Sequence, residues 1–308
     1  MTGPPLLVLR ALGLGDGLTG VPALRGLRRL VAPRPVLLAA PGPLGRWFVD
    51  LGVVDGVVDT SGLHGPPPGR DLGPHDAVDL HGNGPASRDL LAASGPRSLL
   101  AFAPPGRPGV PWVAGEQEVG RWCRLVGSVG ARCGPDDLRL VSRDDAAARR
   151  GDHVVVHPGA ASGSRRWPPD RWAAVAADLS RRGHRVVLTG GPDERDLCAG
   201  VVAAAGLPAD ASTAGRLDLP ALAQLVGTAR LLLCGDTGVA HLGTACAVPS
   251  VLLFGPVAPS AWGPAVDLDL HEVLWHGDGS GDPHGADPDP HLLLVTVGEV
   301  LHAALRML

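Results

Sequence analysis

Short apolar segments alternate with longer segments of helical pattern along most of the chain. In the first half, apolar segments that predict strands lie at Leu6–Leu9, Val36–Ala39, Gly52–Val57, Ala77–Leu80 and Ser98–Ala101. In the second half they lie at His153–His157, Arg185–Thr189, Leu231–Cys234 and Ser250–Phe254. Strands that alternate with helices are typical of βαβ units, so the pattern predicts an α/β protein with parallel sheets.

The helical segments and the loops between them divide the chain into two domains. Helices are expected at Leu18–Leu30, Glu116–Val129, Pro169–Arg182, Asp193–Ala205, Leu219–Val226 (with Asp218 as its cap) and Val295–Met307. Segments 62–74 and 277–290 are predicted loops, and the polar segment 141–152 is interpreted as an interdomain linker. We therefore expect Rossmann-like domains at residues 1–148 and 149–308, with a ligand cleft between them that faces the carboxyl ends of the strands.

The composition excludes one class of partner and explains the use of arginine. The 308 residues carry a net charge of −4, so no basic surface for nucleic acid is expected. The chain has no Lys, Ile or Tyr, beside 27 Arg, 44 Gly and 31 Pro. This bias is typical of a GC-rich genome, so Arg stands here at positions where Lys is common elsewhere.

The cysteines and the opening segment bear on location. The five cysteines form no C-x-x-C pair and no metal-ligand spacing, which favours a reducing cytoplasm. The segment MTGPPLLVLR lacks the basic and apolar regions of a signal peptide, and no segment is long enough to span a membrane. We expect a cytoplasmic protein without a transmembrane segment, and a peripheral contact with the inner face of the membrane stays open.

The segment 231–264 places several polar residues beside glycines at the end of a strand. The strand ends in Gly235-Asp236-Thr237-Gly238, a helix follows at once, and His241 lies one turn inside that helix. Such a turn directs backbone N–H groups and the positive end of the helix dipole to one point, which is how open α/β sheets hold phosphate. The segment therefore predicts a nucleotide-sugar site in which the acid, the hydroxyl and the imidazole orient a sugar and a diphosphate.

A glycine-rich turn also follows the first strand. Gly13-Leu14-Gly15-Asp16-Gly17 would place Asp16 at the start of a helix and facing the cleft, although an N-cap needs no ligand. The spacing does not match the G-x-G-x-x-G fingerprint of dinucleotide-binding proteins, which disfavours a dehydrogenase.

Two more turns in the second half carry groups suited to a nucleotide. The loop after His157 bears Ser162, Ser164, Arg165 and Arg166, and guanidinium groups match diphosphate oxygens, whereas a flexible basic loop anchored by Trp167 is the structural alternative. Gly190-Gly191-Pro192 leads to Glu194, which could accept ribose hydroxyls or simply complement the helix dipole.

Taken in order, these motifs resemble glycosyltransferase family 9, the ADP-heptose heptosyltransferases. In chain order they are Gly15-Asp16 with Pro22, His157-Pro158-Gly159-Ala160, Arg165-Arg166-Trp167-Pro168, Gly190-Gly191-Pro192-Asp193-Glu194, Asp236-Thr237-Gly238-Val239-Ala240-His241, Phe254-Gly255-Pro256 and Trp262-Gly263-Pro264. The resemblance spans almost the whole chain, but segment 61–107 carries no family motif.

The resemblance implies a fold, an activity and a set of site residues. The fold would be GT-B, with the acceptor on the N-terminal domain and the donor on the C-terminal one. The activity would be an inverting, metal-independent transferase without a cofactor, which moves a heptose or related sugar from an ADP-activated donor to a hydroxyl. Asp16 would be the general base. The implied donor-binding residues are Ser162, Ser164, Arg165, Arg166, Gly191, Glu194, Asp236, Thr237, Gly238 and His241.

The residues leave several alternatives open. The donor could instead be a UDP- or dTDP-sugar, and the same fold could serve a nucleotide-sugar epimerase or a binding protein. The acceptor could be a lipid core sugar, a cell-wall glycan or a small metabolite. An arginine patch at Arg25, Arg28, Arg29 and Arg34 could bind an anionic lipid acceptor.

Overall fold

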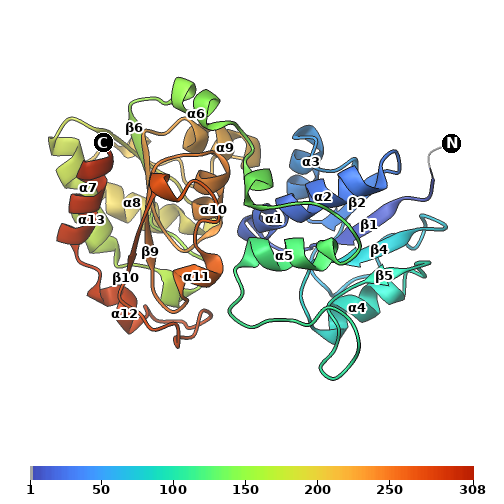
Figure 1. The fold of residues 1–308 in the computed structure, drawn as a ribbon. Helices are drawn as coiled ribbons and strands as arrows, with labels where there is room; N and C mark the ends of the chain where they lie inside the picture. The colour runs from blue at the N-terminus through green and yellow to red at the C-terminus, as the bar shows by residue number, and fades with distance from the viewer. Residues whose placement is uncertain (1–2) are drawn as a thin grey trace. The chain divides into compact units, whose positions relative to one another are not determined.

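The computed structural model describes residues 3–308, which form two compact units (Figure 1). The first unit ends at Leu138 and the second comprises Arg139–Leu308. Each unit is an α/β layer structure with a parallel five-stranded sheet among the described residues. The predicted fold class, two Rossmann-like domains, is therefore confirmed.

The sheet of the first unit has the strand order β3-β2-β1-β4-β5. The strands are β1 (Leu6–Leu9), β2 (Val36–Ala40), β3 (Gly56–Asp59), β4 (Asp76–Asp79) and β5 (Leu99–Leu100). The strand predicted at Gly52–Val57 is wrong at its start. Gly52 has a φ of +66° and ends a helix, and the buried Val53 and Val54 form the turn that leads into β3.

The helices of the first unit are α1 (Leu14–Thr19), α2 (Val21–Val31), α3 (Gly42–Asp50), α4 (Pro85–Ala92) and α5 (Glu118–Gly127), followed by a 3-10 turn at Pro135–Leu138. The single helix predicted at Leu18–Leu30 is two helices that meet at Gly20. Pro22 stands in the first turn of α2, where its missing N–H has no helical partner to lose. The first helix begins at Leu14, so Asp16 lies within its first turn.

The sheet of the second unit has the order β10-β9-β8-β6-β7. Its strands are β6 (His153–His157), β7 (Arg185–Leu188), β8 (Leu231–Gly235), β9 (Ser250–Phe254) and β10 (His271–Trp275). Every residue of β6, β8 and β9 is buried, because helices cover both faces of a parallel sheet. The predicted bounds of β6 and β9 are confirmed to the residue.

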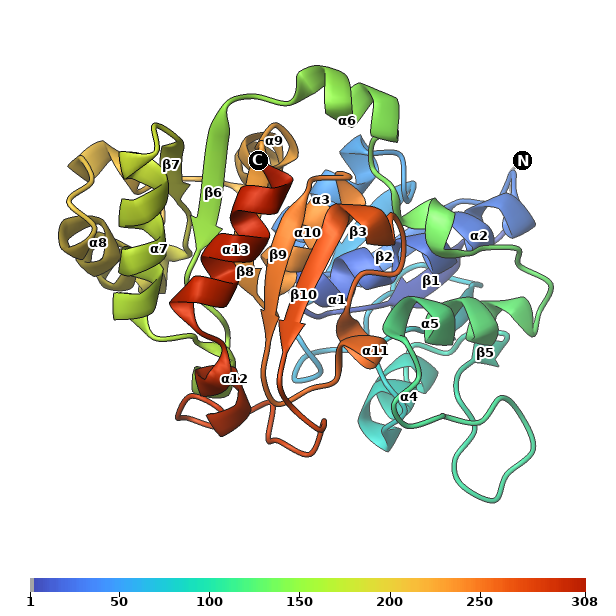
Figure 2. The same cartoon turned by 60° about the vertical axis from the view of Figure 1, so that its left-hand side comes forward.

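Helices cover both faces of this sheet (Figure 2). They are α6 (Arg143–Arg149), α7 (Pro169–Arg181), α8 (Arg195–Ala204), α9 (Leu219–Gly227), α10 (Gly238–Ala245), α11 (Pro259–Trp262), α12 (Pro290–Leu294) and α13 (Val297–Met307). Helices α7 and α13 pack together on one face, and α9 packs with α10 on the other. Asp218 caps α9 as expected, since its carboxylate accepts from the Ala221 N–H at 2.9 Å.

The segment predicted as an interdomain linker, 141–152, contains α6 and is anchored to the second unit. Ser142 caps α6, and Arg139 makes two hydrogen bonds of 2.8 Å to the Asp267 carboxylate. Arg143 contacts both Asp267 and Asp269. These ion pairs explain why the compact units divide before Arg139, whereas the sequence placed the boundary after residue 148.

We expect Asp267→Asn to destabilise the second unit by about 1–2 kcal/mol at neutral pH, because it leaves Arg139 opposite an uncharged amide. The Asp267 side chain is 1% exposed, and the hydrogen bonds from Arg139 hold its pKa below the usual range. A pKa that is lower in the folded than in the unfolded protein stabilises the fold at pH values above the unfolded pKa of about 3.9. This contribution is lost as the pH falls through the folded pKa. Thermal unfolding at several pH values measures the difference, which should shrink in acid.

Asp269→Asn is the matched control, because Asp269 pairs with the same Arg143 but is 64% exposed. A clearly smaller loss than that of Asp267→Asn is expected for it, because exposed ion pairs contribute little to stability. Equal losses in the two variants would contradict the anchoring role of Asp267.

Candidate active site

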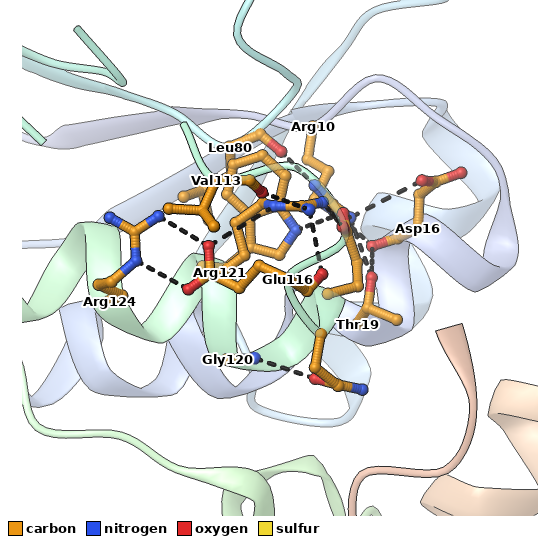
Figure 3. Close-up of polar contacts among 12 residues, drawn as sticks. Arg10, Asp16, Thr19, Leu80, Val113, Glu116, Gly120, Arg121 and Arg124 are labelled. Carbon is orange, nitrogen blue, oxygen red and sulfur yellow. Dashed lines mark hydrogen bonds and ion pairs between the residues drawn. The ribbon is translucent and has the colours of Figure 1, made fainter. Parts of the chain in front are cut away.

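The candidate general base, Asp16, lies in the first turn of α1, just after the carboxyl end of β1 (Figure 3). Its side chain is 35% exposed, so it is open to solvent, and Oδ1 lies 3.8 Å from the Arg10 guanidinium. Its backbone carbonyl accepts from the Thr19 hydroxyl at 3.0 Å and from Arg10 Nε. The backbone of this turn is therefore fixed, and the Asp16 carboxylate is partly exposed beside the Arg10 guanidinium.

Arg10, which the sequence analysis did not single out, holds this turn in place. The residue is 1% exposed and donates to the Leu80 carbonyl, to the Thr19 hydroxyl at 2.9 Å and to Glu118 Oε1 at 3.4 Å. Its guanidinium carbon also lies 4.5 Å from the centre of the Trp122 ring. Burial lowers the pKa of Arg10, and the charges of Asp16 and Glu118 oppose that shift. The only sequence signal is a charged residue directly after an apolar strand.

Glu118, at the start of α5, balances the buried charge of Arg10. The residue is 3% exposed, and Oε1 also accepts from Trp122 Nε1 at 2.7 Å. Its other oxygen pairs with Arg121, which in turn donates to the carbonyls of Val113 and Glu116 (Figure 3). Because each buried charge has an opposite charge beside it, the network is electrostatically satisfied.

In the second unit, Glu194 joins two of the predicted loops. Its Oε2 accepts from the Gly191 N–H at 2.7 Å, and a Cβ on Gly159 would lie only 1.9 Å from Oε1. The carboxylate therefore lies directly against the backbone that follows His157. His157 is buried with Nδ1 3.0 Å from the Thr189 hydroxyl, and burial lowers its pKa against the charge of Glu194. His157 thus supports the loop as a neutral imidazole.

The loop 162–166 carries buried polar atoms that have no hydrogen-bond partner among the described residues. Ser164 is 3% exposed, and its hydroxyl has no hydrogen-bond partner within residues 3–308. Arg165 Nε is likewise buried without a partner in that part of the chain. Arg166 is exposed, and its Nε donates to the Ala160 carbonyl at 2.8 Å. A ligand with acceptor oxygens would satisfy the Arg165 N–H, and either a donor or an acceptor would satisfy the hydroxyl.

Two features hold this loop rigidly. The Trp167 indole is 1% exposed and donates to the Val295 carbonyl at 3.0 Å, so Trp167 anchors the loop in the core, as in the structural alternative named above. The segment 285–289, predicted only as loop, also holds it. The Ser164 N–H donates to the Gly285 carbonyl, and the Asp289 N–H donates to the Ser164 carbonyl. Sequence reasoning did not assign that segment to the site, because no residue in it matches a motif.

Helix α10 begins where β8 ends, as predicted. Thr237 is its N-cap and accepts from the Val239 N–H at 3.1 Å, while Gly238 opens the helix. Asp236 is 4% exposed, with Oδ2 3.8 Å from an Arg165 nitrogen, so the loop after β6 and the turn after β8 meet. The His241 ring lies 6.1 Å from the Trp262 ring of the late Trp-Gly-Pro motif.

The predicted donor-binding residues all belong to the second unit, and the structure joins Arg165 to Asp236 and Glu194 to Gly191. They follow β6, β7 and β8, which are neighbours in the sheet and end at the same edge because they are parallel. Asp16 belongs to the first unit. The arrangement offers two cations, a helix start and two carboxylates for an anionic, hydroxyl-bearing ligand.

The arginine patch of the first unit lies away from the candidate site residues of that unit. The patch Arg25, Arg28, Arg29 and Arg34 lines a cavity of about 680 Å³ in the first unit, near the start of β2 rather than at the edge that carries Asp16. Three of its members are paired with acids, Asp55, Asp137 and Asp76.

Within residues 3–308, no group of three or more His, Cys, Asp or Glu side chains could hold a metal ion.

The comparison with protein families agrees with the motifs. Residues 135–276 match the model of glycosyltransferase family 9 (heptosyltransferase), so the resemblance to this family is confirmed over that segment. Lipopolysaccharide heptosyltransferase 3 of Escherichia coli is 33% identical over 129 residues, which are 41% of this chain and 37% of the relative. The protein of the same name from strain K12 is 30% identical over 168 residues, which are 53% and 48% of the two chains. The matched segments thus span less than half of these relatives.

Solved structures resemble the fold over its whole length. A family 9 glycosyltransferase from Veillonella parvula has a TM-score of 0.77 and 20% identity, with 100% of this chain and 98% of that chain covered. E. coli heptosyltransferase WaaC with ADP has a TM-score of 0.73 and 15% identity, with 99% and 100% covered. The structure of WaaC with ADP-2-deoxy-2-fluoro heptose has a TM-score of 0.66 and 16% identity, and the match covers 98% of this chain and 99% of that chain. At these identities the likeness establishes the GT-B fold.

We expect Gly159→Ala to displace the Glu194 carboxylate, because the new Cβ would lie 1.9 Å from Oε1. The hydrogen bond to the Gly191 N–H would then be lost, at about 1 kcal/mol of unfolding free energy. In a Glu194→Ala background the same change should cost almost nothing. Thermal unfolding of both single variants and the double variant measures this coupling, and strictly additive losses would contradict it.

Proposed function

We propose that this protein is an inverting, metal-independent glycosyltransferase that moves a heptose or related sugar from an ADP-activated donor to a hydroxyl acceptor. The observation that carries the proposal is the contact of Glu194 with the His157–Gly159 loop beside the Arg165–Asp236 pair at the start of α10. The match to family 9, and the solved relative that binds ADP, support this choice of donor.

On this proposal the second unit binds the donor. Arg165 and Arg166 face the diphosphate together with the N–H groups of Thr237 and Gly238, and their positive charge stabilises the leaving group without a metal. Ser162 and Ser164 contribute to the site from the loop after β6, and Gly191 contributes from the loop after β7. Glu194 accepts from the ribose hydroxyls. Asp236 and His241 orient the sugar. Ser164 and Arg165 bring to this task the buried polar atoms that have no partner within residues 3–308.

The first unit binds the acceptor and supplies the base. A hydroxyl oxygen of the acceptor attacks the anomeric carbon from the face opposite the diphosphate, and Asp16 takes the hydroxyl proton. The carbon–oxygen bond to the phosphate breaks, and ADP leaves with the electron pair. A single carboxylate within reach of the nucleophile is sufficient for this displacement, and it inverts the anomeric configuration.

The acceptor class is the broadest part of the proposal. The relatives named above are lipopolysaccharide enzymes, which favours a lipid core sugar, while a cell-wall glycan or a small metabolite has the same reacting hydroxyl. Within residues 3–308, no helix is both long and apolar enough to cross a bilayer. We propose a cytoplasmic location, with the acceptor reached at the inner face of the membrane if it is a lipid.

Calorimetric titration of the purified protein with ADP, UDP, GDP and dTDP, with and without EDTA, tests the donor. We expect ADP to bind most tightly and EDTA to change nothing. A preference for UDP or dTDP would overturn the ADP donor and keep the transferase. Binding of none of the four nucleotides would overturn the proposed function.

We expect Asp16→Asn to lower the rate of ADP release from ADP-heptose by about 10²–10⁴-fold, because the amide cannot take up the proton. The affinity for ADP should stay within twofold, since Asp16 lies outside the donor unit. Mass spectrometry of ADP formation and calorimetry measure the two quantities. A variant that keeps its rate, or that loses ADP binding, would contradict the assignment of Asp16 as base.

Glu194→Gln should weaken ADP binding by about 10–100-fold, because a carboxylate that accepts from ribose hydroxyls is replaced by a neutral amide. Asp193→Asn is the matched control, since Asp193 is the neighbouring acid and is exposed. Calorimetry of both variants, with melting temperatures to check folding, makes the comparison. Equal effects would favour a general role of the two acids in complementing the helix dipole.

A further inference from the structure

The loop that follows β4 lies beside the Asp16 turn because of strand pairing. Strands β1 and β4 are parallel neighbours, with Leu9 opposite Asp79, and the Leu80 N–H donates to the Leu9 carbonyl at 3.0 Å. Arg10 donates to the carbonyl of Leu80 and, through Nε, to the carbonyl of Asp16. One buried guanidinium therefore fixes both the Asp16 turn and the peptide bond that leads into His81.

A buried acid fixes the backbone of His81 from the other side. Asp79 is 0% exposed; its Oδ1 accepts from the His81 N–H at 2.9 Å and its Oδ2 from the Ser87 hydroxyl at 2.6 Å. Burial raises the pKa of Asp79, against the hydrogen bond from Ser87. The start of α4 and the end of β4 are thereby joined, and the Asp79 carboxylate holds the backbone N–H of His81.

One ring nitrogen of His81 makes no hydrogen bond to the described part of the chain. Its Nδ1 is buried and has no hydrogen-bond partner within residues 3–308. Burial lowers the pKa of His81 and the charge of Arg10 lowers it further, while the charge of Asp16 raises it. The ring is therefore neutral near pH 7, and a neutral imidazole offers one donor and one acceptor nitrogen.

We propose that His81 is a second acceptor-binding residue, which hydrogen-bonds a hydroxyl group of the incoming acceptor beside Asp16. This inference rests on the proposed function of the chain. His81 neither gains nor loses a proton in the reaction: the nucleophilic hydroxyl passes its proton to Asp16, while the imidazole orients that hydroxyl or its neighbour. A buried nitrogen without a partner among residues 3–308 is costly in the free protein, and it gains a partner when the acceptor hydroxyl binds.

The proximity of His81 to Asp16 can be tested without catalysis. NMR titration of the histidine ring signals, assigned through His81→Gln, gives the pKa of His81 in the wild type and in Asp16→Asn. Removing the negative charge of Asp16 should lower the pKa of His81, because that charge favours the protonated ring. An unchanged pKa would overturn the proposal, whatever the protein does with nucleotides.

The role in the reaction is tested with ADP-heptose as the only added substrate, so that water takes the place of the acceptor hydroxyl. His81→Ala should slow ADP release by about 3–10-fold, as expected for one lost hydrogen bond, with the Kd for ADP within twofold. His81→Gln should recover part of the rate. Asn83→Ala is the control, since Asn83 is exposed on the same turn; it should match the wild type.

The outcomes separate the two proposals. If the wild type releases ADP and His81→Ala does so equally fast, the role of His81 is overturned and the proposed function stands. If the wild type binds no ADP and releases none, the proposed function fails and the acceptor role of His81 fails with it, even if the NMR coupling to Asp16 is present.

Discussion

The buried guanidinium of Arg10 holds the first unit together at the edge where its chemistry is expected. It contacts Leu80 directly after β4, α1 through Thr19 and the Asp16 carbonyl, and α5 through Glu118. A buried charge of this kind is costly unless each hydrogen-bonding group is matched, so the surrounding elements have little freedom to move independently. This requirement extends to Gly20, where a Cβ would lie 2.8 Å from the Arg10 side chain.

The second unit depends on close approach between backbone and side chain instead of a buried cation. Glu194 can contact the segment after His157 only because residue 159 has no Cβ, and a Cβ on Gly163 would lie 1.6 Å from the Ala286 carbonyl oxygen. These glycines let the loops that follow β6 and β7 and the segment 285–289 approach one another closely. Among residues 3–308 the Ser164 hydroxyl and Arg165 Nε have no hydrogen-bond partner, and on the proposed function the donor completes their hydrogen bonding.

The two units suit the two halves of the proposed reaction by their electrostatics. The second unit concentrates positive groups, namely the Arg165 and Arg166 side chains and the start of α10, which favour a diphosphate as it leaves with added negative charge. The first unit presents a partly exposed carboxylate, Asp16, next to the neutral imidazole proposed to assist it. Asp267 belongs to neither site: its ion pairs with Arg139 and Arg143 fix the first residues of the second unit to its own body.

The sequence by itself determined the α/β class, most strand positions and the glycine turns that carry Asp16, Glu194 and Asp236, because strand periodicity and turn chemistry are local properties. It did not reveal α3, α4, the helix inside the supposed linker or the start of β3, where tertiary packing decides between similar local patterns. Only the tertiary structure decided that Arg10 supports Asp16, that Glu194 lies against Gly159 and that His81 Nδ1 has no partner in the described part of the chain. These contacts join residues distant in sequence, and strand order and helix packing, rather than the residues themselves, bring them together.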